Sequence, residues 1–400
     1  MFRKIAFLSF IVLLTFSCTQ KNQQLATANV NTYIQSIKEE FVPDRRLNRF
    51  DVTATEEAGK IILRGETTLP EAYNKFKSQL GEIAVIDSIT MLPNLGDNAN
   101  KTKGVVNVSV CNIRSNPKHS AELSTQATLG TPLNIYKKEG DWFFVQTPEG
   151  YLGWLDPGGF EWMDDESFEE WQNSEKVIYL KDYGFSISTT DENAERVSDL
   201  ISGNILQLVA SKGIMSKVAY PDGRQAYIPS ENLAFLSNWL ARPDATVEDI
   251  ISTATNYLGR PYLWGGTSGK GMDCSGFTKT VFFMNGYQLL RDASQQVRTG
   301  MPVEVDTTLA NLQRGDLIFF GRKASPEQKE RITHVAIYLG NGEIIHSSGS
   351  DNVCIQSLKR GTPNFVEERL LSIVRASRPL ESPEEYGIPK VSEVYLPRSR

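Results

Sequence analysis

Two stretches of the chain are built from short alternating runs separated by turn residues, and this pattern narrows the folds that are possible. Over 105–163 the runs VVNVSVCNIRS and PLNIYKKEGDWFFVQTPEGYLGWL alternate between polar and apolar residues. Several short strands at such spacing are typical of a small β-barrel. A weaker copy runs over 176–235, where DGRQAYIPSENL takes the place of EGYLGWL. We therefore expect two barrels in tandem, over 104–173 and 174–237.

Both flanks of the barrels mix helical and strand patterns. Before them, NVNTYIQSIKEEF and LPEAYNKFKSQLGE have helical spacing, DVTATEEAGKIILRGETT alternates like a hairpin, and AVIDSITML reads as a strand. This predicts a small α+β domain that, with a polar linker, covers 30–103. After the barrels, 238–400 opens with the helical run VEDIISTATNYL, capped by Thr246 and Asp249, and continues with the strand runs GDLIFFG, THVAIYLG and EIIHSSG. Four hundred residues exceed what one core organises, so we expect a multidomain chain that ends in an α+β domain.

The N-terminus indicates export. An apolar run of 13 residues from Ile5 to Ser17 follows Met-Phe-Arg-Lys, which is too short for the roughly 20 residues that cross a bilayer as a helix. The order of this run, Cys18 and a polar TQKNQQ stretch resembles a bacterial lipoprotein signal, which implies that Cys18 carries lipid. We therefore expect a signal peptide over 1–18, a tether over 19–29, and a periplasmic or cell-surface protein; ordinary signal cleavage is the alternative.

Charge and cysteine content exclude two further classes. A formal net charge of -6 and a pI near 5.4, with no basic stripe, argue against a nucleic-acid partner. Four cysteines are too few for a disulfide framework. If Cys18 carries lipid and Cys274 performs chemistry, Cys111 and Cys354 remain; we expect them as separate thiols, and a disulfide between them is the alternative.

Cys274 lies in the glycine-rich turn GRPYLWGGTSGKGMDCSGF, at or just before the start of a helical segment, FTKTVFFMNG. A helix N-terminus and a neighbouring imidazole both favour the thiolate, which is the nucleophilic form. The glycines let the backbone turn tightly and offer N–H groups to an oxyanion. This combination favours a nucleophile over a buried structural cysteine.

Histidines are scarce, and this narrows the search for a general base. The chain has three, and His119 lies in a loop of the first barrel. His334 and His346 lie on two strand runs joined by a Gly-Asn-Gly hairpin signal. The period of two allows both to face the cysteine, with His334 as the base and His346 bound to its far ring nitrogen.

Two alternatives compete with this interpretation. Each of the three side chains could simply pack in a core. Zinc could also bind Cys274 and the two histidines together with Asp273. Because Asp273 and Cys274 are adjacent on one turn and diverge, they chelate poorly, and we expect no metal and no other cofactor.

The segments PYLWGGTSGKGMDCSGF, RDASQQ, GDLIFF, THVAIYLGNG and IIHSSG, in this order, resemble the catalytic domain of the NlpC-type cysteine peptidases over roughly 247–378. The phrases AELSTQATLGTPL, GDWFFVQ and GYLGWL resemble a bacterial SH3-like domain. A pair of such barrels before this domain is similar to the γ-D-glutamyl-L-diamino acid endopeptidases of the family. The resemblance implies a papain-like α+β domain that cleaves between the side-chain carboxyl of D-glutamate and a diamino acid in peptidoglycan peptides.

The resemblance also implies roles for single residues. Cys274, His334 and His346 match the nucleophile, the base and the orienting residue, and Tyr262 matches the tyrosine that assists at the oxyanion. The groups implied to hold the substrate's amine and D-glutamate carboxylate are Asp273, Ser275, Asp292 and Ser294.

The first barrel is implied to cover the amine-binding end of the site. Glu122 and Tyr151 match the contributing positions, and ordinary packing or solvation within the barrel is the alternative for both. A carboxylate paired with a ligand ammonium selects for a free amine. An enzyme closed in this way would accept short freed peptides and reject intact cross-linked wall.

The expected function is therefore a cysteine endopeptidase acting on peptidoglycan stem peptides of the type L-Ala-γ-D-Glu-diamino acid. We expect a monomer that contacts a membrane only through its lipid. One alternative is a peptidoglycan-binding lipoprotein whose third domain is idle. The other is an amidase or acyltransferase on another substrate, such as a lipid. The patterns leave open whether the diamino acid is diaminopimelate or lysine and which membrane leaflet holds the lipid.

Overall fold

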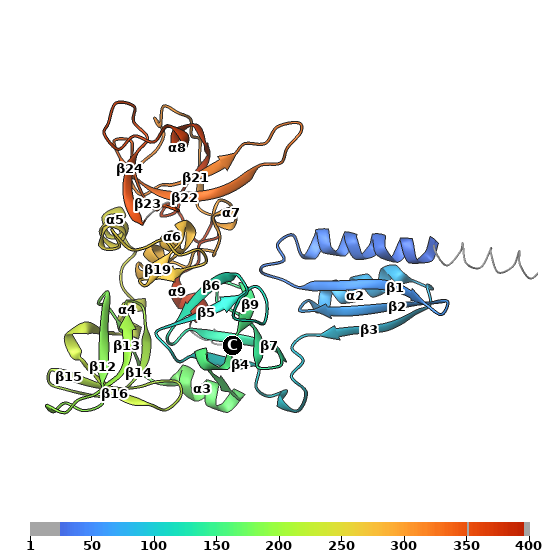
Figure 1. Ribbon diagram of the computed structural model, residues 1–400, viewed down its shortest axis with the longest axis horizontal. Helices are drawn as coiled ribbons and strands as arrows, with labels where there is room; N and C mark the ends of the chain where they lie inside the picture. Colours follow the sequence, from blue (N-terminus) through green and yellow to red (C-terminus); the bar gives the residue numbers. More distant parts are fainter. Residues whose placement is uncertain (1–24, 350–351, 396–400) are drawn as a thin grey trace, which may run out of the picture. The chain divides into compact units, whose positions relative to one another are not determined.

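A computed structural model describes residues 25–349 and 352–395 (Figure 1). The expected signal peptide and Cys18 lie outside the described residues. The chain divides into two compact units, 1–99 and 100–400. Over the ranges that the structure describes, no helix is both long enough and apolar enough to span a membrane.

The first unit is a two-layer α/β domain. A helix over 25–41 precedes the strands β1 (Phe50–Glu57) and β2 (Lys60–Thr67), which form an antiparallel hairpin. Helix α2 (Pro70–Leu80) then leads to β3 (Val85–Met91), which pairs parallel to β2. Apolar side chains from both helices and from β1 and β2 form one core, so the helices cover the same face of the sheet.

The structure differs from the expected boundaries in this region at one point. The tether expected over 19–29 is helical from residue 25 onward, because Ala26 and Val30 lie one helical turn apart and both pack on the core of the first unit. The division between the units falls after Ala99, within the polar linker expected at the end of 30–103.

The second unit begins with a seven-stranded sheet in the order β10-β4-β7-β8-β9-β5-β6. Its strands, short and joined by tight turns as the alternation predicted, are β4 (Lys103–Val106), β5 (Val110–Arg114), β6 (Leu123–Thr128), β7 (Pro132–Glu139), β8 (Trp142–Gln146), β9 (Leu152–Leu155) and β10 (Phe160–Met163). Helix α3 (Asp165–Asn173) follows and packs on this barrel through Trp171.

The second barrel repeats the first strand by strand. Its sheet has the order β17-β11-β14-β15-β16-β12-β13, which is the order of the first barrel with each strand number raised by seven. The strands are β11 (Lys176–Tyr179), β12 (Tyr183–Ile187), β13 (Arg196–Ile201), β14 (Ile205–Lys212), β15 (Met215–Ala219), β16 (Gln225–Pro229) and β17 (Leu233–Phe235). The tandem repeat expected from the alternating runs is present.

The remaining residues form an α+β domain on a six-stranded antiparallel sheet, ordered β20-β25-β21-β22-β23-β24. These strands are β20 (Met301–Val303), β21 (Leu317–Arg322), β22 (Arg331–Gly340), β23 (Glu343–Ser347), β24 (Val353–Ser357) and β25 (Ile373–Arg378). The helices and short strands around it are α4 (Leu236–Leu240), α5 (Val247–Asn256), β18 (Thr267–Ser268), β19 (Gly271–Met272), α6 (Cys274–Met284), α7 (Ala293–Gln296), α8 (Glu367–Leu371) and α9 (Val391–Tyr395). The capping box of Thr246 and Asp249 at α5 is confirmed.

Both faces of this sheet are covered. Helix α6 packs on one face, where Phe277 and Val281 share a core with Val335 and Ile337. Helix α8 packs on the other through Leu370. The central strands are therefore buried on both sides, which explains the near-continuous apolar runs LIFF and VAIY.

The strand segments that carry His334 and His346 lie at one end of the sheet. Strands β21 and β23 end there, and β22, β24 and β25 begin there. A bulge opposite Phe320 places Thr333 outside the ladder immediately before His334. Such irregularities re-aim side chains next to functional sites.

Candidate active site

Cys274 is the first residue of α6, and the chain around it is tightly packed. Asp273 caps the helix by accepting the Gly276 N–H at 2.8 Å. A Cβ on Gly276 would lie 1.9 Å from the carbonyl oxygen of Gly266, so the turn before the helix can approach only because residue 276 is glycine. The expectation that the helix starts at or just after the cysteine is confirmed, and the sulfur lies at the N-terminal end of the helix dipole.

Cys274 is buried, with 8% of the residue exposed. Burial, followed by the charge of Asp273, raises the pKa of Cys274 to about 12, and the N–H groups of Val335 and Ser275 oppose this in part. In the described chain no hydrogen bond joins Cys274 to the His334 side chain. Because burial raises its pKa, the thiol keeps its proton in the resting site.

His334 on β22 and His346 on β23 form a direct pair. Nε2 of His334 lies 2.6 Å from Nδ1 of His346, and the two rings meet edge to face. In the tautomer that carries a proton on Nε2 of His334, this nitrogen donates to Nδ1 of His346, and Nδ1 of His334 is left to accept the thiol proton. Burial, followed by the charges of His346 and Arg369, lowers the pKa of His334 well below 6.5, so the imidazole is neutral and has a nitrogen free to accept a proton.

Gln356 on β24 extends this pair to a third strand. Burial, then the Arg369 charge, lowers the pKa of His346 to about 4, and Gln356 opposes the shift. Nε2 of His346 and Oε1 of Gln356 are both buried, and in the described residues neither meets a partner at full hydrogen-bonding geometry. In the tautomer in which His346 accepts at Nδ1, its own proton lies on Nε2, where the Gln356 oxygen is the nearby acceptor.

Tyr262 lies beside Cys274 in the loop before α6. Burial, followed by the charges of Cys274 and Asp273, raises the pKa of the Tyr262 phenol. Its hydroxyl therefore keeps its proton and can donate to an oxyanion formed next to the sulfur.

A buried ion pair lies under the nucleophile. Arg291 is 1% exposed and grips Asp273 with both terminal nitrogens, at 2.6 and 3.1 Å. Burial opposes the charge of Arg291, but Asp273 outweighs this and raises the pKa of the guanidinium. Asp273 also accepts the N–H groups of Gly265 and Gly276, and Ser275 hydrogen-bonds to both Asp273 and Arg291.

These contacts add a structural role to the one that the resemblance implied for Asp273 and Ser275. Asp273 and Ser275 were expected to hold the substrate, but five internal donors occupy the Asp273 carboxylate and both side chains are buried. These contacts make both residues part of the support of α6, and their implied contact with the substrate stays a prediction. The physical reason is Arg291, whose buried charge requires a carboxylate.

The residues expected at the amine-binding end lie where the first barrel meets the catalytic domain. The Tyr151 hydroxyl donates to Asp292 at 3.0 Å, and the indole N–H of Trp264 donates to Glu122 at 2.7 Å. Asp292 immediately precedes α7, and Ser294 lies half-buried on that helix. Glu122 and Tyr151 therefore both face the catalytic domain rather than pointing away from it.

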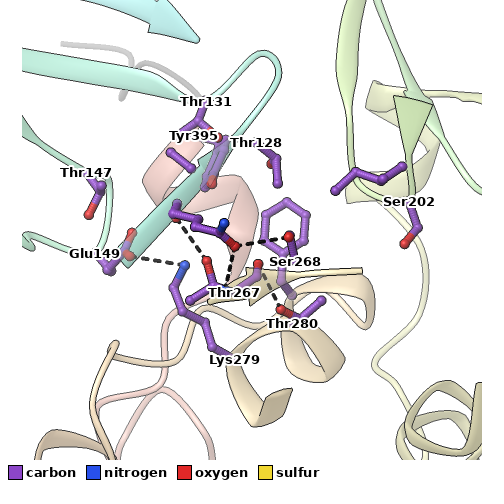
Figure 2. Close-up of a pocket in the computed structure, with 14 residues that line it drawn as sticks. Thr128, Thr131, Thr147, Glu149, Ser202, Thr267, Ser268, Lys279, Thr280 and Tyr395 are labelled. Carbon is purple, nitrogen blue, oxygen red and sulfur yellow. Dashed lines mark hydrogen bonds and ion pairs between the residues drawn. The ribbon is translucent and has the colours of Figure 1, made fainter. Parts of the chain in front are cut away.

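Hydrogen bonds and an ion pair beside a small pocket join the first barrel to the catalytic domain (Figure 2). The carbonyl oxygen of Gln126 accepts the Thr267 hydroxyl, and its side-chain oxygen accepts the Thr267 N–H and the Ser268 hydroxyl. Lys279 of α6 forms a buried ion pair with Glu149 of the barrel, at 3.0 Å. The barrel thus contacts both the loop that carries Tyr262 and the helix that carries Cys274.

The second barrel holds the same loop from another side. Asp199 pairs with Lys270 at 2.6 Å, and Asp182 pairs with Arg260 at 3.0 Å. Both barrels therefore fix the segment between α5 and α6 that precedes the nucleophile.

Comparison with known proteins agrees with this geometry. The NlpC/P60 family model matches residues 259–375, and the model of the bacterial dipeptidyl-peptidase Sh3 domain matches residues 113–158. A Gamma-D-glutamyl-L-lysine dipeptidyl-peptidase of Bacillus cereus is 33% identical over 256 residues, which span 62% of this chain and 73% of the relative. The chain belongs to the NlpC/P60 family.

A second relative and a solved structure of the NlpC/P60 family extend the match across the barrels. The Gamma-D-glutamyl-L-lysine dipeptidyl-peptidase of Bacillus subtilis is 32% identical, over 56% of this chain and 72% of its own length. The crystal structure of an NlpC/P60 family protein from Bacillus cereus, 28% identical, aligns with a TM-score of 0.59 over 70% of this chain and 99% of its own. The expected multidomain fold, with an SH3-like barrel and an NlpC/P60 cysteine peptidase domain, is confirmed.

Within this NlpC/P60 domain three charged or polar residues were missed by sequence reasoning. Arg291 is the first residue of the RDASQQ segment, and its position directly after Leu289 and Leu290 was the one available signal that it could be buried. Gln356 and Arg369 follow the histidines on later segments and match no motif. Their places beside His346 and Phe320 depend on strand pairing.

Described residues show no group of three or more histidine, cysteine or acidic side chains arranged for a metal ion. Cys111 is buried in the first barrel and Cys354 lies on β24, and no disulfide joins them. His119 packs its ring against Trp142 in the first barrel.

Proposed function

We propose that this NlpC/P60 cysteine peptidase hydrolyses the γ-D-glutamyl–diamino acid bond of short peptidoglycan peptides that carry a free N-terminal L-alanine. Two relatives are named for γ-D-glutamyl-L-lysine dipeptidyl-peptidase activity. The observation that carries the proposal for this chain is the contact of Tyr151 with Asp292, because it puts the first barrel against one end of the site.

That contact supports selection at the amine end. Glu122 from the barrel and Asp292 from the catalytic domain are carboxylates on either side of one domain junction. An ammonium group at this junction would find two acceptors, whereas an acylated nitrogen would lose the charge and meet the barrel. A peptide continuing into glycan strands would be excluded for the same reason.

The reaction follows from the arrangement of three side chains. Nδ1 of His334 takes the proton of Cys274 as the sulfur attacks the γ-carbonyl carbon, and the Tyr262 hydroxyl donates to the oxyanion. The carbon–nitrogen bond then breaks, and His334 returns the proton to the leaving amine, which leaves a thioester. Water attacks that thioester with His334 as base, the carbon–sulfur bond breaks, and the thiol regains its proton.

The test compares L-Ala-γ-D-Glu-L-Lys with its N-acetylated form by chromatographic measurement of released lysine. We expect the free-amine peptide to be cleaved on the order of 100-fold faster, since acetylation removes a charge that two carboxylates would bind. Glu122→Gln should narrow the preference, and Glu139→Gln, an exposed glutamate of the same barrel, should leave it unchanged. Equal rates on the two peptides would contradict selection of the amine, and no release from either would contradict the proposed function.

The pH dependence of this reaction follows from the His334 environment. Burial, then His346 and Arg369, lowers the pKa of His334, so the neutral base persists to lower pH and is lost only as pH falls through the lowered pKa. We expect the acidic limb of kcat/KM to lie below pH 6.5, measured with the free-amine peptide between about pH 4 and pH 8. An acidic limb at or above 6.5 would show that the base is not the buried imidazole described here.

We also propose that the protein is exported and anchored through a lipid on Cys18. The support is the apolar run that ends at Ser17, followed by a cysteine and a polar stretch. Growth with a radiolabelled fatty acid should label the native protein and not Cys18→Ser. Label retained in the variant would contradict the anchor.

A further inference from the structure

We propose that Arg369 binds a carboxylate of the diamino acid that leaves during the reaction, and so acts as a specificity-determining residue on the leaving-group side of the site. The inference rests on the proposed function, and it adds the chemistry by which the released residue is recognised.

The position of Arg369 follows from the sheet. Helix α8 directly precedes β25, whose first residue, Ile373, pairs with Phe320; Phe320 in turn pairs with His334. The Arg369 guanidinium carbon lies 5.7 Å from the centre of the Phe320 ring, and that ring lies 5.7 Å from the centre of the His334 ring. Arg369 is therefore at the same end of the sheet as the histidine pair, one aromatic ring away.

The charge of Arg369 reaches the reacting groups. After burial, which is the largest influence on each pKa, the positive charge lowers the pKa of Tyr262, His334 and His346. Arg291 acts instead on Cys274 and Tyr262. The contacts of the two arginines differ as well: Arg291 donates to Thr125 of the first barrel, whereas Arg369 lies over the ring of Phe320.

Their partners also differ. Arg291 is neutralised by Asp273. Arg369 is half-buried against Phe320, and over the described ranges no carboxylate lies within ion-pair distance of it. Glu367, on the same short helix, pairs with Arg360 instead. A half-buried guanidinium on an aromatic face without an acidic neighbour is suited to an anionic ligand.

Charge on the substrate matches this arrangement. The amine end of the site carries Glu122 and Asp292, whereas Arg369 lies over Phe320, whose ring is next to His334. Because His334 protonates the leaving amine, the diamino acid must lie next to His334, which is where Arg369 is found. A short peptide with an ammonium at one end and a carboxylate at the other would meet opposite charges at both ends.

Two carboxylates of the leaving residue share this chemistry. One is the α-carboxylate of a third residue that ends the peptide, and the other is the distal carboxylate of diaminopimelate. Three peptides separate them: L-Ala-γ-D-Glu-L-Lys, the same peptide with a C-terminal amide, and L-Ala-γ-D-Glu-diaminopimelate with its α-carboxyl amidated. The lysine amide lacks both carboxylates and is the common reference.

The experiment measures kcat/KM of the full-length protein on the three peptides. We expect the wild type to prefer at least one carboxylate-bearing peptide over the lysine amide by about 10- to 100-fold, the range for a hydrogen bond between charged groups. A preference for the lysine acid assigns the α-carboxylate, and a preference for the diaminopimelate peptide assigns the distal one. Arg369→Gln should bring that ratio close to one, and Arg369→Lys should leave an intermediate ratio because lysine keeps the charge without the fork.

Arg375→Gln is the matched control, since Arg375 is 59% exposed on β25 and pairs with Glu330. It should keep the wild-type ratio. The inference is overturned, while the proposed function stands, if wild-type kcat/KM on both carboxylate peptides equals that on the lysine amide. It is overturned equally if Arg369→Gln keeps the full wild-type preference for a carboxylate peptide. If Arg369→Gln does not fold, an undiminished ratio in Arg369→Lys overturns it equally. Failure of the wild type to cleave any of the three peptides overturns the proposed function and the inference together.

Discussion

Cys274→Ala is expected to lower kcat/KM on L-Ala-γ-D-Glu-L-Lys by a factor on the order of 10⁴ to 10⁶, because no other group in this geometry can form the thioester. Cys274→Ser should be nearly as inactive, since a serine hydroxyl is a weaker acid than a thiol and His334 is a weak base at its lowered pKa. Release of lysine, followed at enzyme concentrations high enough to see single turnovers, measures the loss.

Cys111→Ala is the matched control for this experiment. Cys111 is also buried, and burial raises its pKa to about 12, as it does for Cys274. The two thiols differ in position: Cys111 lies in the first barrel, and Cys274 lies at a helix N-terminus beside the His334 strand. Full activity of Cys274→Ala, or loss of activity in a folded Cys111→Ala, would remove Cys274 from its assigned role.

Arg291→Met is expected to destabilise the second unit by about 3 to 5 kcal/mol, because it leaves the buried Asp273 carboxylate without its cation. The variant also removes the donor to Thr125 of the first barrel, a contact of 3.1 Å. Urea unfolding of the full-length protein, followed by tryptophan fluorescence, should show the shift. Because several domains contribute to the unfolding curve, the urea midpoints of the variant and the wild type are compared for the same transition.

The same substitution at a surface arginine provides the control. Arg375→Met removes an exposed pair with Glu330 and should cost about 1 kcal/mol or less. Combining Arg291→Met with Asp273→Asn should recover part of the loss, because the unpaired charge is then gone. If Arg291→Met and Arg375→Met shift the midpoint equally, the buried pair does not support α6 as described.

The histidine pair shows how far local patterns can predict a site. A Gly-Asn-Gly signal predicts a tight hairpin, and the hairpin between β22 and β23 is present. With three histidines in the chain, two of them on these strands, a pair near the cysteine was the simplest arrangement. The 2.6 Å contact between His334 and His346 agrees with that prediction, although the bulge at Thr333 that aims His334 left no mark in the sequence.

The support of the nucleophile was not predictable in the same way. Asp273 was expected to bind substrate, and the structure pairs it with Arg291, which is 18 residues away. A carboxylate next to a nucleophile has the same sequence signature whether it faces a ligand or a buried arginine. The difference depends on which side chains the folded core brings to it.

By itself, the sequence determined what depends on short-range order: the alternation that builds two barrels, the helix that begins at Cys274, the strands that carry His334 and His346, and the motifs that place the chain in its family. Only the tertiary structure decided which polar and charged side chains contact one another. The contacts of Tyr151 with Asp292 and of Glu122 with Trp264 each join residues about 140 positions apart, and Arg369 reaches His334 through Phe320 on a neighbouring strand. Such contacts arise from domain packing and strand order. The sequence immediately around each residue does not indicate which distant residue it will contact.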